Sequence, residues 1–382
     1  MGWSSNCEDG FLIFKSPSYI FCAFPIFNCP ATRKVRGMNL EPVAVVGASG
    51  YSGEELVRLL SRHPGVDLVA LTSRQLAGQT VETVFPKFAG LRYSQLAFIE
   101  SSVDKIVATG ARTVFLALPH GVAAEYAKPL VDAKLRVIDL SADFRIKDAA
   151  VYQEFYGEAA HAPELAAISV YGLPEIYREQ IRNAQLVASP GCYPTSAIVP
   201  LYPLLKRRML KPESIIINSL SGVSGAGRTA KVDYLYVECN ESVRAYSVPK
   251  HRHLAEIEQE LSNAYGEDVT VSFVPHLIPV NRGIATTIHA TPADGIGLAE
   301  ISQAYKEAYA NEPFVRLLGE KGTPDTKNVT FTNFIDVAWR HDPRTGRMVL
   351  LSAEDNLVKG AAGQAVQSLN VMCGWPETTA LL

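Results

Sequence analysis

A short apolar strand, a glycine-rich turn and an amphipathic helix follow one another directly near the start of the chain. Residues 43–46 are continuously apolar, and residues 47–53 read GASGYSG. Beyond the turn, Leu56 and Leu60 mark the apolar face of a helix, which the Pro64-Gly65 pair ends. This succession is typical of the first βα unit of a parallel sheet and restricts the chain to a small set of α/β architectures.

The alternation of strand and helix continues through residue 140. Apolar strands are predicted at residues 67–72, 113–118 and 135–140, with a helix at 123–133 between the last two. Strands that alternate with helices build a doubly wound parallel sheet. We therefore expect the α/β class, with a Rossmann-type domain over residues 38–188.

The glycine turn predicts a dinucleotide site. Such a turn presents backbone N–H groups to a diphosphate, and glycine permits close approach. The spacing is G-x-x-G-x-x-G rather than the usual G-x-G-x-x-G, so an ordinary tight βα turn is the alternative. We expect the cofactor to contact Gly47, Ser49, Gly50, Tyr51, Ser52 and Gly53.

The end of the second predicted strand indicates which dinucleotide binds. An NAD enzyme has Asp or Glu there for the ribose 2′-hydroxyl, whereas this chain reads LTSR at residues 71–74. The Arg74 guanidinium, helped by the Ser73 hydroxyl, would pair with a 2′-phosphate. The pattern favours NADP(H); an exposed loop arginine is the alternative.

Beyond residue 188 the sequence becomes richer in predicted strands. Strands are expected at 214–220, 269–274 and 283–290. Helices are expected at 195–207 and 254–264. They predict a second, α+β domain over residues 189–354. Residues 355–382 contain a final helical pattern at 361–372, which we expect to return to the NADP domain.

Cys192 lies in a turn that opens a helix, within the sequence SPGCYPT. A helix N-terminus stabilises a thiolate, which is the nucleophilic form. A buried structural cysteine is the alternative, and we adopt it for Cys239 and Cys373. A thiol beside a nicotinamide indicates that the thiolate attacks an activated acyl group and that the resulting thioester accepts hydride.

Two histidines begin the predicted helix at 254–264, and an acid follows them. His253 and Glu256 are three positions apart on one helix face, so we expect the carboxylate to contact the imidazole as an acid–base pair. A metal site that uses His251 and His253 is a weaker alternative because the sequence places no third ligand, and we expect no metal. A helix-capping surface cluster is another. The remaining histidines are read as structural or exposed: His63, His120, His161, His276, His289 and His341.

Two further segments carry groups suited to anions. Residues 221–228, SGVSGAGR, offer hydroxyls, backbone amides and one arginine as a phosphate cradle, with a plain glycine loop as the alternative. Residues 139–145, DLSADFR, bring two acids and Arg145 to a strand end, where α/β sheets place their sites. A structural salt bridge would explain the second segment equally well.

Charge and apolar content exclude several classes of partner. Of 382 residues, 36 are Lys or Arg and 39 are Asp or Glu, so no positive field attracts nucleic acid or an anionic membrane. The apolar run at residues 19–27 is shorter than the roughly 20 residues that span a bilayer. Six cysteines without a C-x-x-C pair indicate a reducing compartment.

Residues 1–37 show neither a helical nor an alternating hydrophobic pattern, so we expect them to be an N-terminal extension outside the fold. Transit peptides are poor in acidic residues, so Glu8 and Asp9 argue against one here. Met38 is a possible start just before the first predicted strand. We expect a cytoplasmic protein, with organellar import through residues 1–37 left open.

Several sequence blocks between residues 41 and 375 resemble, in order, those of the N-acetyl-gamma-glutamyl-phosphate reductases, within the semialdehyde dehydrogenase group. They are GASGYSG (47–53), LPHG (118–121), DLSADFR (139–145), YGLPE (171–175), SPGCYPT (189–195), SGVSGAGR (221–228), HRHLAEIEQEL (251–261), PHLIPVNRGI (275–284) and DNLVKGAAGQAVQ (355–367). Ala255 and Ser368 depart from the proline and asparagine expected there.

The resemblance implies a homo-oligomeric enzyme, a dimer or tetramer, that reduces N-acetyl-L-glutamyl 5-phosphate with NADPH to the 5-semialdehyde and releases phosphate. It implies that residues 189–354 are the catalytic and dimerisation domain, that Cys192 is the nucleophile and that His253 with Glu256 relays protons. Asn356 would lie near the nicotinamide. The groups expected near the substrate's phosphate or carboxylate are Arg145, Ser221, Gly222, Ser224, His251 and Arg282.

Two alternatives stay open at this point. Another acyl-phosphate reductase, acting on aspartyl phosphate or on carrier-linked aminoadipyl phosphate, would share the fold. A non-catalytic NADP-sensing protein would bind cofactor through the Gly47 turn but would have an unreactive Cys192.

Overall fold

Two seven-stranded sheets organise the chain, whose computed structural model describes residues 7–8, 11–12 and 40–382. Cys7–Glu8 (β1) pairs antiparallel with Phe11–Leu12 (β2). The rest of the predicted extension, 1–37, and the possible start at Met38 lie outside the described residues. Among the described residues, no helix is long and apolar enough to cross a membrane.

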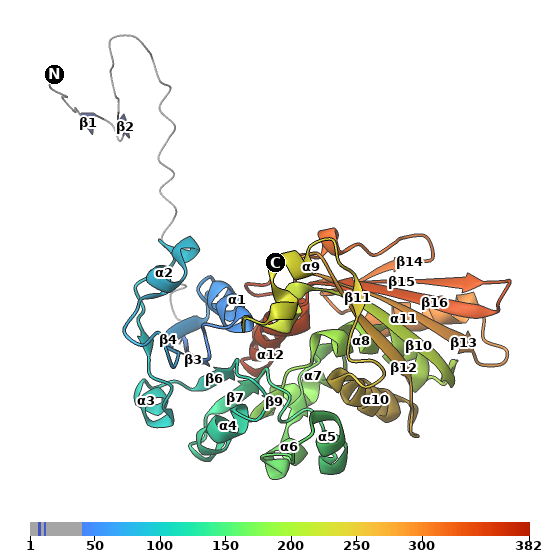
Figure 1. Cartoon of the computed structure of the whole chain (residues 1–382), viewed down its shortest axis with the longest axis horizontal. Helices are drawn as coiled ribbons and strands as arrows, with labels where there is room; N and C mark the ends of the chain where they lie inside the picture. The colour runs from blue at the N-terminus through green and yellow to red at the C-terminus, as the bar shows by residue number, and fades with distance from the viewer. Residues whose placement is uncertain (1–6, 9–10, 13–39) are drawn as a thin grey trace, which may run out of the picture. The chain divides into compact units, whose positions relative to one another are not determined.

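The first sheet is entirely parallel, with the strand order β5-β4-β3-β6-β7-β9-β8 (Figure 1). The order reverses between β3 and β6, which is the switch point where such sheets bind ligands. The predicted strands of this half are confirmed. The bounds are Glu41–Val46 (β3), Val66–Thr72 (β4), Phe98–Ile99 (β5), Thr113–Leu116 (β6), Arg136–Asp139 (β7), Val170–Tyr171 (β8) and Leu186–Ala188 (β9).

Helices cover both faces of the parallel sheet because its strands are apolar on both sides. Val43 and Val45 of β3 pack in one cluster with Tyr51–Leu60 (α1) and Gly363–Met372 (α12). Ala44 and Val46 pack in the opposite cluster with Val103–Ala108 (α3) and Ala123–Asp132 (α4). The chain thus ends on the first sheet, where α12 packs against α1 and Pro174–Arg182 (α7).

The second sheet is mixed, with the order β11-β12-β10-β13-β16-β15-β14 (Figure 1). One face packs against three helices, Cys192–Lys206 (α8), Arg252–Tyr265 (α10) and Leu298–Tyr309 (α11). The strand bounds are Leu210–Gly222 (β10), Arg244–Ala245 (β11), Ser272–Ile278 (β12), Ile284–Pro292 (β13), Val315–Gly319 (β14), Ile335–Asp342 (β15) and Arg347–Glu354 (β16).

Short helices connect these elements. They are Val81–Val84 (α2), Pro86–Phe88 (η1), Ala149–Tyr156 (α5), Pro163–Ile168 (α6), Val223–Ala226 (η2), Val232–Tyr234 (η3), Tyr236–Cys239 (α9), Thr326–Asn328 (η4) and a π-helical turn, Val358–Ala362 (η5). The predicted strand at 269–274 begins later, at Ser272, and the predicted helix at 361–372 begins after η5.

A parallel sheet covered by helices, together with a mixed sheet, confirms the predicted α/β class. Residues 40–382 pack as one compact unit, so the domain boundaries after residues 188 and 354 stay a proposal in which each sheet centres one domain.

Candidate active site

The glycine turn brings backbone, rather than side chains, to the switch point of the first sheet. Gly47 has a φ of +79°, and a Cβ on it would lie 2.4 Å from the Ala117 carbonyl oxygen after β6. A Cβ on Gly53 would lie 2.4 Å from the Gly47 carbonyl oxygen. Both positions therefore require glycine, and the turn leaves space that a diphosphate can approach.

The first turn of α1 fits a diphosphate as well. Gly50 is the N-cap of α1 and has an extended conformation. Because glycine has no side chain, it makes no capping hydrogen bond to the first backbone N–H groups of the helix. Such N–H groups, with the helix dipole, bind anions. At the next strand end, the Ser49 and Ser73 hydroxyls lie 3.3 Å apart, and Arg74 is exposed. The residues present thus fit a dinucleotide.

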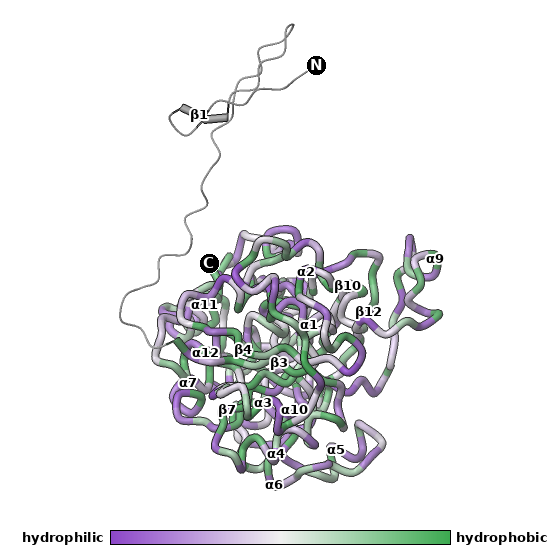
Figure 2. The backbone as a smooth tube through the Cα atoms, turned by 90° about the vertical axis from the view of Figure 1, so that its left-hand side faces the viewer, coloured by the Kyte–Doolittle hydropathy of each residue, from purple (hydrophilic) through white to green (hydrophobic). Residues whose placement is uncertain are grey.

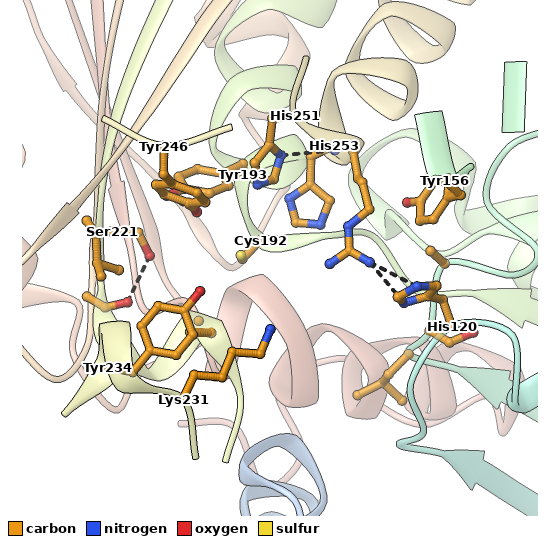
Figure 3. A pocket seen from close by; sticks show the side chains of 18 of the residues that line it. His120, Tyr156, Cys192, Tyr193, Ser221, Lys231, Tyr234, Tyr246, His251 and His253 are labelled. Atoms are coloured by element: carbon orange, nitrogen blue, oxygen red, sulfur yellow. Dashed lines mark hydrogen bonds between the residues drawn. The ribbon is translucent and has the colours of Figure 1, made fainter. Parts of the chain in front are cut away.

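A cavity of about 450 Å³ lies where the two halves of the chain meet. The Cys192 sulfur lies near its centre, with His253 on one side and Lys231 and Tyr234 on the other (Figure 3). Leu118 lines this cavity and also contacts the position of a Cβ on Gly47, at 3.1 Å. The glycine turn and the cysteine therefore border neighbouring spaces, as a shared reaction centre requires.

Cys192 is the first residue of α8 and is partly exposed to the cavity. Burial, followed by the charge of Glu354, raises the pKa of its thiol to about 12, although the Tyr193 backbone N–H and Arg145 act in the opposite direction. Desolvation thus opposes the thiolate stabilisation that is expected from the helix N-terminus. The free protein holds a thiol, whose proton must move before the sulfur can attack.

The two histidines have different positions in the site. His251 is the N-cap of α10, and its Nδ1 accepts a hydrogen bond from the His253 backbone N–H at 3.1 Å. The His253 ring lies against the turn before Cys192, since a Cβ on Gly191 would lie 2.6 Å from its Nε2. Burial lowers the pKa of His251 to about 4 and that of His253 well below its usual value. Both imidazoles are therefore neutral near pH 7.

The expected pairing of Glu256 with His253 is wrong. In the described part of the chain, Glu256 accepts hydrogen bonds from the Tyr171 hydroxyl (2.7 Å), the Gly191 N–H (2.8 Å) and Arg145 Nη1 (3.2 Å), and none from His253. A charged donor such as Arg145 forms a stronger hydrogen bond to a buried carboxylate than a neutral imidazole does. The Arg145 guanidinium therefore occupies Glu256 in place of His253. Glu256 instead fixes the turn that begins α8.

Arg145 borders the cavity as predicted. Its Nη1 bonds to Glu256 and its Nη2 to the Leu140 carbonyl oxygen at 2.7 Å, while its Nε has no partner among the described residues. Arg145 thus forms a salt bridge, but with Glu256 of α10 rather than with the acids of its own segment. The guanidinium is held in place while its Nε–H stays without a partner among the described residues.

The loop at 221–228 reaches the cavity only in part. Ser221 and Gly222 line it, as expected, whereas the Ser224 hydroxyl accepts a hydrogen bond from Asn356 at 2.9 Å. Asn356, expected near the nicotinamide, is buried and also accepts from the Gly283 N–H at 2.8 Å. Ser224 and Asn356 thus hold two loops together, and neither lines the cavity.

Arg282, expected near the substrate, is not among the side chains that line the cavity. It forms ion pairs with Glu55 (2.8 Å) and Asp355 (3.3 Å) and stacks on Phe331. Both carboxylates are buried and need a cation, and Arg282 supplies it. Through Glu55 it joins the second half of the chain to α1.

Comparison with known proteins decides the family. An N-acetyl-gamma-glutamyl-phosphate reductase of Akkermansia muciniphila is 59% identical over 344 residues, which cover 90% of this chain and 99% of that protein. The chain belongs to this reductase family. A Moorella thermoacetica protein of the same name is 51% identical over 337 residues, which cover 88% and 96% of the two chains.

Family models and solved structures agree with this placement. Residues 42–184 match the NAD binding domain of semialdehyde dehydrogenase, and residues 192–356 match its dimerisation domain. The fold is similar to that of Vibrio cholerae aspartate semialdehyde dehydrogenase II (TM-score 0.67, 18% identity, 88% and 99% of the two chains covered). The Candida albicans enzyme with NADP gives a TM-score of 0.68 at 16% identity, with 87% and 99% covered.

Several residues of this reductase's cavity were missed in the sequence. The side chains come from three separate parts of the chain: His120, Tyr156, and the group Lys231, Tyr234, Arg244, Tyr246 and Arg252. His120, expected to be structural or exposed, contacts Arg252 at 3.0 Å (Figure 3). No spacing pattern marks these residues; only the LPHG block and the arginine of HRH pointed toward the site. Within the described ranges, no cluster of three or more metal-ligating side chains forms.

Proposed function

We propose that the protein reduces N-acetyl-L-glutamyl 5-phosphate with NADPH to N-acetyl-L-glutamate 5-semialdehyde and releases phosphate. One observation carries this proposal: a cysteine at a helix start lies in a cation-lined cavity that adjoins the glycine turn. The names of the reductases that are 59% and 51% identical support the substrate.

The charge of the cavity suits a substrate with two anionic ends. Arg145, Lys231, Arg244 and Arg252 line it against one acid, Asp233. An acyl phosphate of an N-acetylated amino acid carries both a phosphate and a carboxylate. Arginine and lysine bind these groups by charge-assisted hydrogen bonds, and the unused Nε–H of Arg145 is one available donor.

The chemistry begins at Cys192. Its thiolate attacks the acyl carbon and forms a tetrahedral intermediate, which expels phosphate and leaves a thioester on the sulfur. His253 is neutral and can donate its ring N–H to the carbonyl oxygen as negative charge develops there. Later it gives and takes protons at that oxygen. Glu256 positions Arg145 and the turn before Cys192 rather than acting as a relay.

The cofactor is held by backbone and by a basic side chain. Gly47, Gly50 and Gly53 would hold the diphosphate at the start of α1, and Ser73 with Arg74 would hold the 2′-phosphate of NADP. Bound NADPH supplies the hydride that reduces the thioester. The thiolate is a good leaving group, so the reduced intermediate collapses to the aldehyde and frees Cys192.

The test is NADPH oxidation with three acyl phosphates: N-acetylglutamyl, aspartyl and carrier-linked aminoadipyl. We expect kcat/KM to be highest for the first, and NADH to be the poorer reductant. Highest activity with aspartyl phosphate would replace the substrate assigned here. An NADP sensor would oxidise no NADPH, and its Cys192 would gain no protection from iodoacetamide when acyl phosphate is present.

We further propose a homodimer built on the open face of the mixed sheet. Ile216 and Leu220 of β10 are 39% and 38% exposed, and Tyr236 and Val237 of α9 are 78% and 76% exposed. Figure 2 shows α9 projecting beyond the neighbouring strands β10 and β12. Exposed apolar surface of this kind marks an interface, and this region matches a dimerisation domain. Leu220→Asp should give a monomer in sedimentation equilibrium; an unchanged oligomer would exclude this face.

A cytoplasmic location stays a prediction.

A further inference from the structure

A buried carboxyl group that the mechanism above does not use lies next to Cys192. Glu354 is the last residue of β16, and its backbone pairs with Ile284 and Ile335 on either side. Its side chain is fully buried, and neither carboxyl oxygen has a hydrogen-bond partner among the described residues. A buried carboxylate without partners is unfavourable, so it is a strong acceptor for a proton from a neighbouring group.

A glycine lets this carboxyl group and the cysteine approach each other. Gly360 lies in the π-helical turn η5, and a Cβ on it would lie 2.7 Å from Cys192 Cβ and 2.9 Å from Glu354 Oε1. The two side chains therefore flank the same point in space, which only a residue without a side chain leaves open. Cys192 Cβ and the unpartnered Oε1 of Glu354 thus both lie within 3 Å of one point, so the cysteine side chain starts beside this acid.

The surrounding charges leave Glu354 without a cation of its own. Lys359 is nearby, but its ammonium binds Glu175 at 2.6 Å in a fully buried ion pair and also donates to Gln367. Burial raises the pKa of Glu354 well above its usual value; Lys359 opposes this, and Asp355 and Glu175 add to it.

The same coupling acts on the cysteine. The titratable and charged groups around Cys192 are Glu354, Arg145, Glu256, Tyr193, Tyr246 and His253. After burial itself, the negative charge of Glu354 raises the pKa of the thiol most. Each member of the pair thus favours a proton while the other is charged. A coupled pair of this kind holds one proton over a wide pH range.

We propose that Glu354 is the proton acceptor for the Cys192 thiol: it takes the thiol proton as the sulfur attacks and returns it when the sulfur is released. This role rests on the proposed function and adds to it a residue in a different element from the histidines. A carboxylate in this desolvated position is a stronger base than one in water. Transfer also removes the adjacent negative charge at the moment when the sulfur becomes anionic.

The step balances in protons and electrons. In the first half, the S–H bond of Cys192 breaks, an O–H bond forms on Glu354, and the electron pair left on sulfur forms the bond to the acyl carbon. Phosphate leaves with the electrons of its C–O bond and takes a proton from solvent. In the second half, the thioester carbon receives hydride, the C–S bond breaks, and the thiolate takes back the proton from Glu354.

The test is the pH dependence of iodoacetamide alkylation, quantified on the Cys192 peptide by mass spectrometry. While the pair holds one proton, the fraction with the charge on sulfur is constant, so the wild-type rate should show a flat region between the two titrations of the pair. In Glu354→Gln the thiol titrates alone, so the rate should rise about tenfold per pH unit. Glu354→Asp should restore a flat region.

Controls keep the outcome decisive. Glu260→Gln removes another buried acid, bonded to Tyr177 on the far side of Glu256, and should keep the flat profile. NADPH binding checks that each variant is folded, and if Glu354→Gln fails that check, the wild-type and Glu354→Asp profiles decide. A wild-type rate that rises tenfold per unit throughout, or a flat profile in Glu354→Gln, overturns the proposal. Turnover by Cys192→Ser would instead overturn the proposed function.

Discussion

The glycine turn at residues 47–53 acts through its backbone, whereas the cavity around Cys192 acts through buried side chains. The turn requires glycine at Gly47 and Gly53, because a Cβ at either position would lie 2.4 Å from a neighbouring carbonyl oxygen. The cavity needs charges that are held by partners, such as Arg145 on Glu256. A site that binds through backbone groups is encoded by one contiguous segment of the sequence. A site that binds through charged side chains depends on contacts between segments that lie far apart in the sequence. The two regions should therefore respond differently to substitution.

The largest expected effect separates chemistry from cofactor binding. Cys192→Ser should lower kcat/KM by at least about a thousandfold, because serine is a much weaker nucleophile in the same place. The Kd for NADPH, from fluorescence titration, should stay within about twofold, since the turn is untouched. The matched control is Cys373→Ser, at the end of α12, which should keep full activity. Substantial turnover by Cys192→Ser would remove the cavity from the reaction.

The reverse experiment damages the turn. Gly47→Ala adds a Cβ at a positive φ and against the Ala117 carbonyl oxygen, and we expect NADPH affinity to fall by at least about tenfold. Gly78→Ala is the control, because Gly78 also has a positive φ, +88°, but a Cβ there meets nothing within 4 Å. It should cost about 1 kcal/mol in the free energy of unfolding and leave affinity unchanged. Equal losses of affinity in both variants would mean that close approach does not matter.

Charge reversal tests the one cofactor contact expected from a charged side chain. Arg74→Glu should reduce the preference for NADPH over NADH, in kcat/KM, by about 10- to 100-fold, the value of a charge-assisted hydrogen bond. Arg62→Glu introduces the same charge change at another exposed position and should have little effect. An unchanged preference in Arg74→Glu would leave the exposed-loop interpretation.

The smallest expected effect concerns pH and belongs to the cavity alone. The pKa of His253 is lowered by burial, so below its ordinary value of 6.5 the unfolded chain binds a proton that the folded chain does not. The free energy of unfolding should therefore fall as pH drops below about 6.5, and His253→Gln should reduce this slope by up to about 1.4 kcal/mol per pH unit. Urea unfolding at several pH values measures it. His341→Gln, at an exposed position, should leave the slope unchanged; a slope unaltered in His253→Gln contradicts the buried neutral imidazole.

The sequence predicts the parallel sheet and the place of the glycine turn because both depend on short contiguous patterns. It also predicts that Cys192 starts a helix. It does not predict the partner of Glu256, because the spacing of three residues says only which helix face is shared, and Arg145 and Tyr171 arrive from other elements. Arg282 lies in the block PHLIPVNRGI, yet it pairs with two buried acids that lie far away in the sequence, Glu55 and Asp355. Glu354 reads as an ordinary strand end until Gly360 brings Cys192 beside it.

The central claim is that an acyl group passes through a thioester on one sulfur. Mass spectrometry of the protein mixed with N-acetylglutamyl phosphate, without NADPH and quenched in acid, tests this directly. The account predicts an N-acetylglutamyl adduct on the Cys192 peptide, released as semialdehyde when NADPH is added before the quench. An acyl group on another residue, or turnover with NADPH while Cys192 stays unmodified in its absence, would contradict it.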